Sequence, residues 1–276
     1  MRQFDRQYIF SAGRAGQQGF ETSELHIHFQ IQKSDCETPN TSKINLWNLS
    51  PEHLAVLNEK DCIATLRAGY GNRMPLISVG AVSYIQTTLD GSDRMTAIET
   101  IDGRIELRDN FVSLSYGGRI HSRKILEDIS EKMGITMIVS HAAELIILPN
   151  GFFFVGAAKD ALGKICGANK FTWSIQNGIL QITKKGNPIS KEVFVLSPDS
   201  GLIRIPQKIC YGSDGSFAEG QTGYEVQFFM NGAINVNDYV RLESETVKGY
   251  FRVHSVLADG DNFDGSWICT AKLLEV

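Results

Sequence analysis

The sequence lacks the surplus of positive charge that a nucleic-acid-binding protein needs. Its 276 residues include 27 Lys and Arg against 31 Asp and Glu, which gives a formal net charge of −4 at pH 7. Proteins that grip a phosphate backbone use clustered Lys and Arg, and this chain has no long basic run. The composition therefore argues against a protein whose task is to hold DNA or RNA.

Cysteine is scarce and scattered. The five cysteines are odd in number and have no paired spacing that would indicate a zinc site or a redox dithiol: Cys36, Cys62, Cys166, Cys210 and Cys269. We interpret them as free thiols of a reducing cytoplasm, because lone cysteines mostly behave as small buried apolar groups. A single catalytic cysteine is the alternative that the sequence leaves open.

Long apolar runs are also missing. At the N-terminus, Asp5 and Arg6 stand where a signal peptide would need an unbroken apolar core. The most apolar region, LIILPNGFFFV, is interrupted by Pro149, Asn150 and Gly151 and is too short to cross a bilayer as a helix. The sequence therefore predicts neither a signal peptide nor a membrane span.

What the sequence does contain is a series of β patterns, beginning with ELHIHFQI at residues 24–31. Every second residue there is apolar, which is the period of a half-buried strand. Ser50 and Pro51 mark the start of one short helix, and LDGSD marks a turn between two strands. Further strands are expected at Lys43–Trp47, Asp61–Ala68, Leu76–Thr88 and Arg94–Ile101.

The pattern changes to mixed α and β after about Asp102. HSRKILEDISEKMG places its apolar residues on one helical face and ends at Gly134. We expect a strand at ITMIVS, a short hairpin about Pro149–Gly151, and a second helix near Ala157–Ala168. In FTWSIQNGILQIT, Asn177 and Gly178 separate two β runs and predict a tight hairpin turn.

After the polar linker KKGNPIS the chain returns to alternating β patterns, such as GYEVQFFM. We therefore predict a mainly β fold with an α+β middle section. Two small β-barrel or sandwich domains, 1–105 and 188–276, are joined by a small α+β domain, 106–187. More than one core is expected, because a chain of this length is near the limit that one core serves.

Two features invite a metal interpretation. His26 and His28 lie two apart on a strand, so both rings project from one face, but no third ligand can be identified. ADGDNFDGS gathers Asp259, Asp261 and Asp264, yet the sixth position of a calcium loop is Asp264 instead of Gly. A solvated or interface face for the histidines and a hairpin loop for the aspartates are the favoured interpretations.

Catalytic motifs are not found. The glycines at 13, 16 and 19 lack the Gly-Lys-Ser/Thr end of a phosphate loop, and no Gly-x-Ser-x-Gly elbow is present. We predict no catalytic, cofactor-binding or metal-binding residue and no cofactor. The glycine-rich segments Ser11–Phe20 and Gly212–Gly223 are expected to become ordered only on assembly.

Several short motifs follow one another along the first β segment, namely Asn48–Ser50, Ala68–Tyr70, Gly80 and Asp102–Gly103. Their order resembles the N-terminal domain of phage tail baseplate hub proteins, the contractile-tail family related to late control protein D. The middle segment is similar to the family's α+β insertion, and GYFRVHSVLADGDNFDGSW resembles its final barrel. Where the family usually has Gly-Asp, this chain has Asn237 and Asp238.

The resemblance implies a non-enzymatic structural protein of the virion tail baseplate, made in the host bacterial cytoplasm. It implies a homotrimeric ring whose six β domains are related to the tail-tube protein. The ring would join the tail tube or a tube-initiator protein to the central spike protein, contact other baseplate proteins, and let DNA pass through its channel. The alternative is a carbohydrate-binding or hydrolytic β protein of the tail tip, with Trp47, Trp173 and Trp267 as candidate aromatics.

Overall fold

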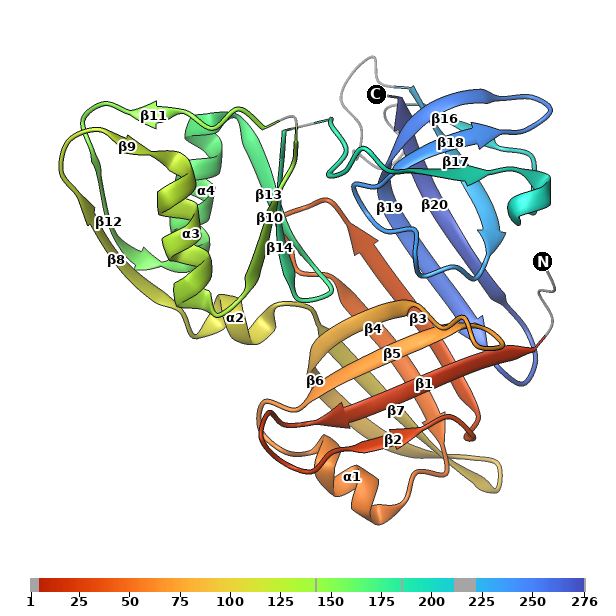
Figure 1. Ribbon diagram of the computed structural model, residues 1–276. Helices are drawn as coiled ribbons and strands as arrows, with labels where there is room; N and C mark the ends of the chain where they lie inside the picture. The colour runs from red at the N-terminus through yellow and green to blue at the C-terminus, as the bar shows by residue number, and fades with distance from the viewer. Residues whose placement is uncertain (1–4, 142, 185, 211–221, 276) are drawn as a thin grey trace.

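The computed structural model describes residues 5–141, 143–184, 186–210 and 222–275 (Figure 1). The fold is mainly β with few helices, as the sequence predicted. We use three names below: the N-terminal β unit for Arg6–Ile101, the middle unit for Arg104–Lys184, and the C-terminal β unit for Val193–Glu275. The domain boundaries expected at 105/106 and 187/188 remain a prediction.

The N-terminal β unit is an antiparallel sheet in the order β3-β4-β7-β6-β5-β1-β2. α1 begins after Ser50, whose side chain accepts the backbone N–H of His53, so the expected helix start is confirmed. The alternation at 27–31 is also confirmed, because Ile27, Phe29 and Ile31 are all buried. The elements are β1 (Arg6–Gly13), β2 (Phe20–Thr22), β3 (Ile27–Ser34), β4 (Thr41–Trp47), α1 (Pro51–Leu57), β5 (Ile63–Tyr70), β6 (Leu76–Asp90) and β7 (Asp93–Ile101).

The middle unit packs two helices against a three-stranded sheet, β10-β14-β13. Both helices and the turn at Asn177 and Gly178 lie where the sequence predicted them, and both turn residues have positive φ. The elements are α2 (Arg104–Arg108), β8 (Phe111–Tyr116), β9 (Ile120–His121), α3 (Ser122–Met133), β10 (Thr136–Val139), β11 (Ile147–Leu148), β12 (Phe152–Ala157), α4 (Ala158–Asn169), β13 (Phe171–Gln176) and β14 (Ile179–Lys184).

The hairpin expected about Pro149–Gly151 is wrong. β11 pairs with β9 and β12 pairs with β8, so the strands that flank this turn do not pair with each other. The turn is instead a bend between two separate two-stranded ribbons. Gly151 fits this bend because it has φ 78° and because a β-carbon at this position would lie 2.2 Å from the carbonyl oxygen of Tyr116.

The C-terminal β unit continues the sheet of the N-terminal unit. β19 pairs with β3 from Ser255↔Ser34 to Asp261↔His28, and we call this strand pair the seam. The result is one sheet of 13 strands. The elements are β15 (Val193–Leu196), η1 (Pro198–Ser200), β16 (Gln207–Cys210), β17 (Thr222–Phe229), β18 (Tyr239–Glu243), β19 (Lys248–Asp261) and β20 (Trp267–Glu275).

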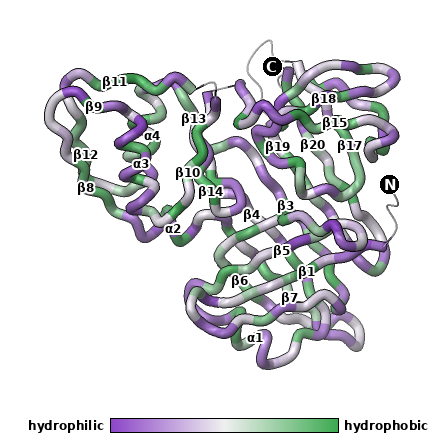
Figure 2. The backbone as a smooth tube through the Cα atoms, in the orientation of Figure 1, coloured by the Kyte–Doolittle hydropathy of each residue, from purple (hydrophilic) through white to green (hydrophobic). Residues whose placement is uncertain are grey.

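The buried apolar side chains form two clusters. One cluster runs through both β units, from Tyr8 to Leu273, and the other lies within the middle unit. Hydrophilic and hydrophobic stretches alternate along the strands of the β units (Figure 2), as expected of sheets with one buried face. In the described residues no helix has both the length and the apolar character to cross a membrane.

Candidate functional site at the seam between the units

The two sequence features that suggested metal chemistry lie side by side across the seam. His26 Nε2 is 3.1 Å from Asp261 Oδ1, and His28 Nε2 is 3.3 Å from Asp259 Oδ1. The two histidines belong to the chain around β3, and the two aspartates belong to β19. Sequence reasoning found both motifs but had no means of joining them.

These four side chains form pairs rather than a metal cage. Asp261 Oδ1 also accepts the backbone N–H groups of Phe263 and Asp264, which fixes the loop after β19. Burial opposes ionisation of Asp261, but these hydrogen bonds and His26 outweigh it and hold its pKa below the usual value. No three His, Cys, Asp or Glu side chains within the described ranges are grouped to hold a metal ion.

A third pair crosses the other end of the seam. His254 Nδ1 lies 2.8 Å from Asp35 Oδ1, and Arg252 Nη1 donates to Asp35 Oδ2 at 2.5 Å and to Asn237 Oδ1 at 2.8 Å. Burial opposes ionisation of Asp35, yet the hydrogen bond from His254 and the charge of Arg252 keep its pKa low. Oppositely charged or polar partners therefore tie the two β units together at both ends of β3.

The face of the sheet opposite the core runs without interruption across both β units. Directly paired residues form one row over seven strands: Tyr84, Glu99, Lys43, Gln30, Asp259, Ile268 and Phe229. Lys43 and Glu99 lie 3.8 Å apart in this row, and Asp259 faces His28. The charged residues of this row are thus matched by a neighbour of opposite sign or by a histidine.

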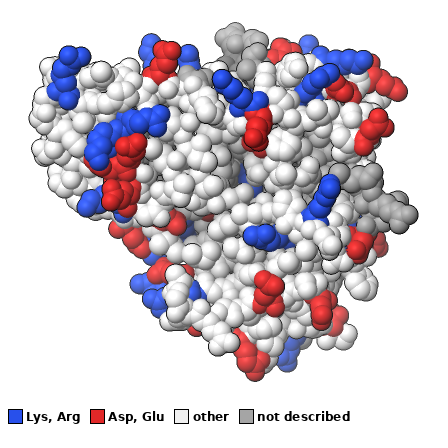
Figure 3. Space-filling model, viewed as in Figure 1, with Lys and Arg blue, Asp and Glu red and all other residues white. Residues whose placement is uncertain are grey.

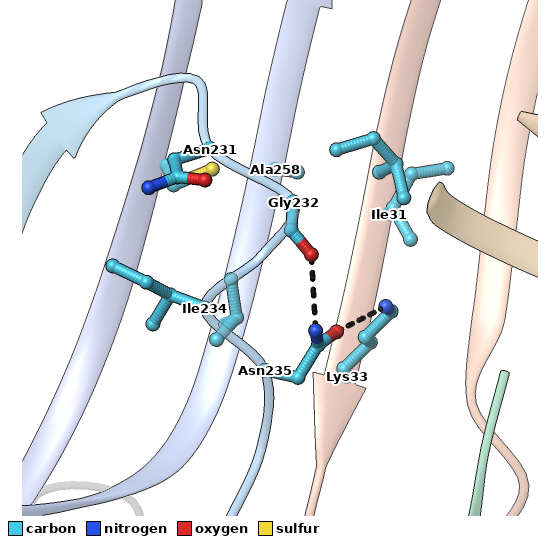
Figure 4. A pocket seen from close by; sticks show the side chains of 10 residues that line it. Ile31, Lys33, Asn231, Gly232, Ile234, Asn235 and Ala258 are labelled. Carbon is cyan, nitrogen blue, oxygen red and sulfur yellow. Dashed lines mark hydrogen bonds between the residues drawn. The ribbon is translucent and has the colours of Figure 1, made fainter. Parts of the chain in front are cut away.

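All three units contribute to a buried polar junction, of which Figure 4 shows the residues from the two β units. Asn235, in the segment after β17, accepts a hydrogen bond from Lys33 Nζ of β3 at 2.9 Å. Its Oδ1 is also 3.5 Å from Asn177 Nδ2 of the middle unit, and its backbone N–H donates to Asp238 at 2.7 Å. Lys33 is only 6% exposed. Sequence reasoning singled out neither Lys33 nor Asn235.

The Asn177–Gly178 turn reaches this junction from the middle unit. The backbone N–H groups of Asn177 and Gly178 donate to the carboxylate of Asp102 at 2.5 and 2.9 Å. Burial raises the pKa of Asp102 even though these two donors act in the opposite direction. Asp102 and Gly103 were part of the family resemblance, and here they form the surface on which the middle unit rests.

Two of the three tryptophans are almost fully buried, although Trp267 lies in the wall of a groove that also contains Tyr70 and Phe229. Trp173 and Trp267 are 4% and 3% exposed. Trp47 is half-buried, and its ring is stacked on His26 with 3.9 Å between centroids. Little ring surface of Trp173 and Trp267 is therefore open to a sugar, and His26 covers one face of the Trp47 ring.

Exposed apolar residues occur in several places, among them a two-stranded ribbon of the middle unit and the walls of two grooves. On the β8–β12 ribbon, Phe111, Phe153 and Val155 are 71%, 67% and 50% exposed. A groove of about 630 Å³ beside β15 and a second of about 610 Å³ share Tyr70 and Phe229 as a common wall.

The remaining sequence features carry no identifiable site. Cys36 is exposed, and Cys62, Cys166 and Cys269 are buried free thiols. Gly13 and Gly19 lie against each other where β1 turns towards β2. The absence of a side chain at these two positions lets the two backbone segments come close together. Most of Gly212–Gly223 lies outside the described residues.

Comparison by sequence gives no relative. No protein-family model matches the chain, and no curated protein matches it.

Comparison by structure gives clear matches to tail proteins. The 43 kDa tail protein of prophage MuSo2 from Shewanella oneidensis has a TM-score of 0.66 at 12% identity, with 98% of this chain and 96% of that chain covered. A tail protein from Neisseria meningitidis has a TM-score of 0.63 at 10% identity, covering 97% and 96%. At these identities the matches establish a shared fold.

A third match comes from a secretion machine. The Escherichia coli c3393 protein, described as a type VI secretion component similar to the bacteriophage T4 tail proteins gp27 and gp5, has a TM-score of 0.63 at 9% identity. The match covers 96% of this chain and 76% of that chain. The chain thus has the fold of phage tail and type VI secretion proteins over nearly its whole length.

Proposed function

We propose that this protein is a structural hub of a contractile tail, in which three copies form a ring that joins the tail tube to the central spike. The carrying observation is the single sheet face that crosses both β units. A ring that repeats this face would present a continuous wall to its lumen. The shared fold with prophage tail proteins supports the same role.

The chemistry of this wall fits a channel through which DNA slides. In the row described above, Lys43 is paired with Glu99, and amide and hydroxyl side chains such as Gln30, Asn45 and Thr41 lie beside them on β3 and β4. A wall rich in unpaired Lys and Arg would bind the phosphate backbone and resist movement. On the face seen in Figure 3, positive and negative residues are likewise interspersed.

An open sheet edge supports ring formation. β5 pairs with β6 only as far as Ala81, so within the described residues the stretch Tyr84–Asp90 of β6 has β7 as its one strand partner. Exposed edges of this kind must be protected or paired. A head-to-tail contact between copies, which closes into a ring when the rotation permits, would pair it.

The role is structural, and no step of catalysis is assigned. The proposed partners are the tail tube or its initiator, the spike, and other baseplate proteins, and the proposed location is the virion tail. A complex that pairs a relative of this fold with a partner is known from Francisella, as PdpA–VgrG, where this chain matches 58% of the solved chain with a TM-score of 0.58.

The test is the molar mass of the purified chain by light scattering, alone and with the cognate tube and spike proteins. Three copies of 30.6 kDa give about 92 kDa. A trimer in either condition supports the proposal, and a monomer in both overturns it. Replacing Gln86 and Thr88 with Lys on the open edge should weaken the trimer, whereas Lys substitutions at Glu127 and Glu131 on the exposed face of α3 should not.

A further inference from the structure

The two β units repeat one arrangement of strands. In the N-terminal β unit, β3 to β7 lie in the sheet in the order β3-β4-β7-β6-β5. In the C-terminal β unit, β16 to β20 lie in the order β16-β17-β20-β19, with β18 paired to β19. All of these neighbours are antiparallel. Strand by strand, β16 therefore corresponds to β3, and β19 corresponds to β6.

The two long strands match residue by residue. β6 shifts its register against β7 between Val82 and Tyr84, and β19 shifts against β20 between Val253 and Ser255. The pairs that flank the shift match as well, namely Val82↔Thr100 and Tyr84↔Glu99 in one unit and Val253↔Leu273 and Ser255↔Lys272 in the other. Along both strands from this bulge, Thr88 therefore corresponds to Asp259.

The first strand of each unit is aligned through its neighbours. Two rows of directly paired residues lead from that strand to the matched positions Glu99 and Lys272, and these rows are Gln30–Lys43–Glu99 and Gln207–Glu225–Lys272. Gln207 of β16 therefore corresponds to Gln30 of β3. In the seam, Gln30 lies directly opposite Asp259.

One contact of this arrangement is not repeated within the chain. The second half of β19 pairs with β3 to make the seam, whereas the corresponding half of β6, Tyr84–Asp90, pairs only with β7 among the described residues. In the same ranges β16 pairs only with β17. Six strands lie between β6 and β16 in the sheet, namely β17, β20, β19, β3, β4 and β7, and Figure 1 shows the two strands in different units. Each copy thus has both halves of a second seam, one at each end of its wall.

We propose that β6 of one copy pairs with β16 of the next copy, antiparallel and in the register of the seam. This inference rests on the proposed trimer and names the strands that close it. The register of the seam places Thr88 of one copy opposite Gln207 of the next. A head-to-tail contact of this kind generates a ring when its rotation closes. Every copy then adds eight strands to the wall, from β6 to β16.

The facing side chains suit a sheet contact. In the proposed register the directly opposite residues are Gln86 with Ile209, Thr87 with Lys208 and Thr88 with Gln207. No two like charges face each other, so nothing in these pairs opposes the contact. Pairing also satisfies the open backbone donors and acceptors of both edges. Leu89, which is 78% exposed in one copy, corresponds to Gly260, the position that lies against Phe29 in the seam, so the contact removes a leucine from water.

The experiment is disulfide trapping in the full chain. Thr88→Cys and Gln207→Cys are combined with Cys36→Ser and Cys210→Ser, and the other three cysteines are buried. Facing α-carbons of an antiparallel pair are about 4.5–5.5 Å apart, which lies within the range of about 4.4–6.8 Å that a disulfide bridges. Mild oxidation, with and without the cognate tube and spike proteins, should therefore give covalent species of two and three chains on a non-reducing gel.

Thr88→Cys with Lys208→Cys is the matched control. Successive residues of a strand point to opposite faces, so this combination should give no covalent trimer. Gln30→Cys with Asp259→Cys tests the same facing geometry inside the seam, and it should form a disulfide within one chain.

The outcomes distinguish this contact from the trimer itself. A chain that is a trimer by molar mass but gives no covalent product from the Thr88 and Gln207 positions overturns the β6–β16 contact and leaves the trimer standing. Equal covalent product from the control combination overturns the proposed register. A monomer in every condition overturns the trimer, and the contact with it.

Discussion

A side chain at Gly260 should destabilise the seam. Gly260 pairs directly with Phe29 across β19 and β3, and a β-carbon there would lie 2.3 Å from the far end of the Phe29 ring. Phe29 is fully buried, and its ring packs edge-on against Trp267 with 5.4 Å between centroids. The ring can move only by displacing its neighbours in the shared core.

The size of the effect can be worked out from this geometry. Overpacking a well-filled core lowers stability by about 1–3 kcal/mol. Replacing Gly by Ala in a strand raises stability by about 0.5–1 kcal/mol, because the unfolded chain then has less conformational entropy to lose. Gly260→Ala should therefore lower the free energy of unfolding by roughly 1–2 kcal/mol.

The assay is urea unfolding, with Gly163→Ala as control. Gly163 lies within α4, and nothing stands within 4 Å of the β-carbon it would gain. The control should raise the free energy of unfolding by about 0.5–1 kcal/mol. If Gly260→Ala is as stable as wild type, Phe29 has room that the structure does not show, and the argument fails.

Three further predictions concern single contacts. Asp35→Asn removes the charged partner of buried Arg252, so it should cost about 3–5 kcal/mol by urea unfolding at pH 7. Because the pKa of Asp35 is lowered in the folded protein, the stability difference between wild type and Asp35→Asn is present above the ordinary carboxyl pKa and should shrink as the pH falls below about 4. An undiminished difference at low pH would contradict this reasoning. Ser50→Ala removes the N-cap of α1 and should lower the free energy of unfolding by about 1 kcal/mol, measured by thermal unfolding. Ser50→Asp should retain most of the stability, because Asp can also cap a helix. An equal loss of stability in both variants would argue against capping. Phe153→Ser should change the stability of the isolated chain by less than about 0.5 kcal/mol in calorimetry, since its side chain is 67% exposed, and a larger loss would mean that the β8–β12 ribbon is covered in solution.

Local patterns predicted the local structure well. The alternation at 27–31, the cap at Ser50 and the positive-φ turn at Asn177 and Gly178 each depend on residues that are near in sequence. The failed hairpin about Pro149–Gly151 shows the limit of such reasoning. Turn residues indicate a reversal or bend, but the partner of each strand is decided by distant packing, here by β8 and β9.

The site could be predicted only in part, for the same reason. His26 and Asp261 were both noticed, but 235 residues separate them, and no local pattern states that β3 and β19 pair. Lys33 did leave a signal. It continues the inward series Ile27, Phe29 and Ile31 at the same two-residue spacing, so the alternation already placed an ammonium group on the buried face. A charged residue in an otherwise apolar series points to a junction.

The seam also constrains the order in which the chain can mature on the ribosome. β3 ends at Ser34, whereas its partner β19 begins only at Lys248, so β3 is made long before β19. Until β19 emerges, the edge of β3 that it covers is an open row of backbone donors and acceptors, which can pair with any other chain at hand. A chain that stopped before Lys248 would leave that edge unpaired, so the arrival of β19 both completes the sheet and protects β3 against pairing with other chains.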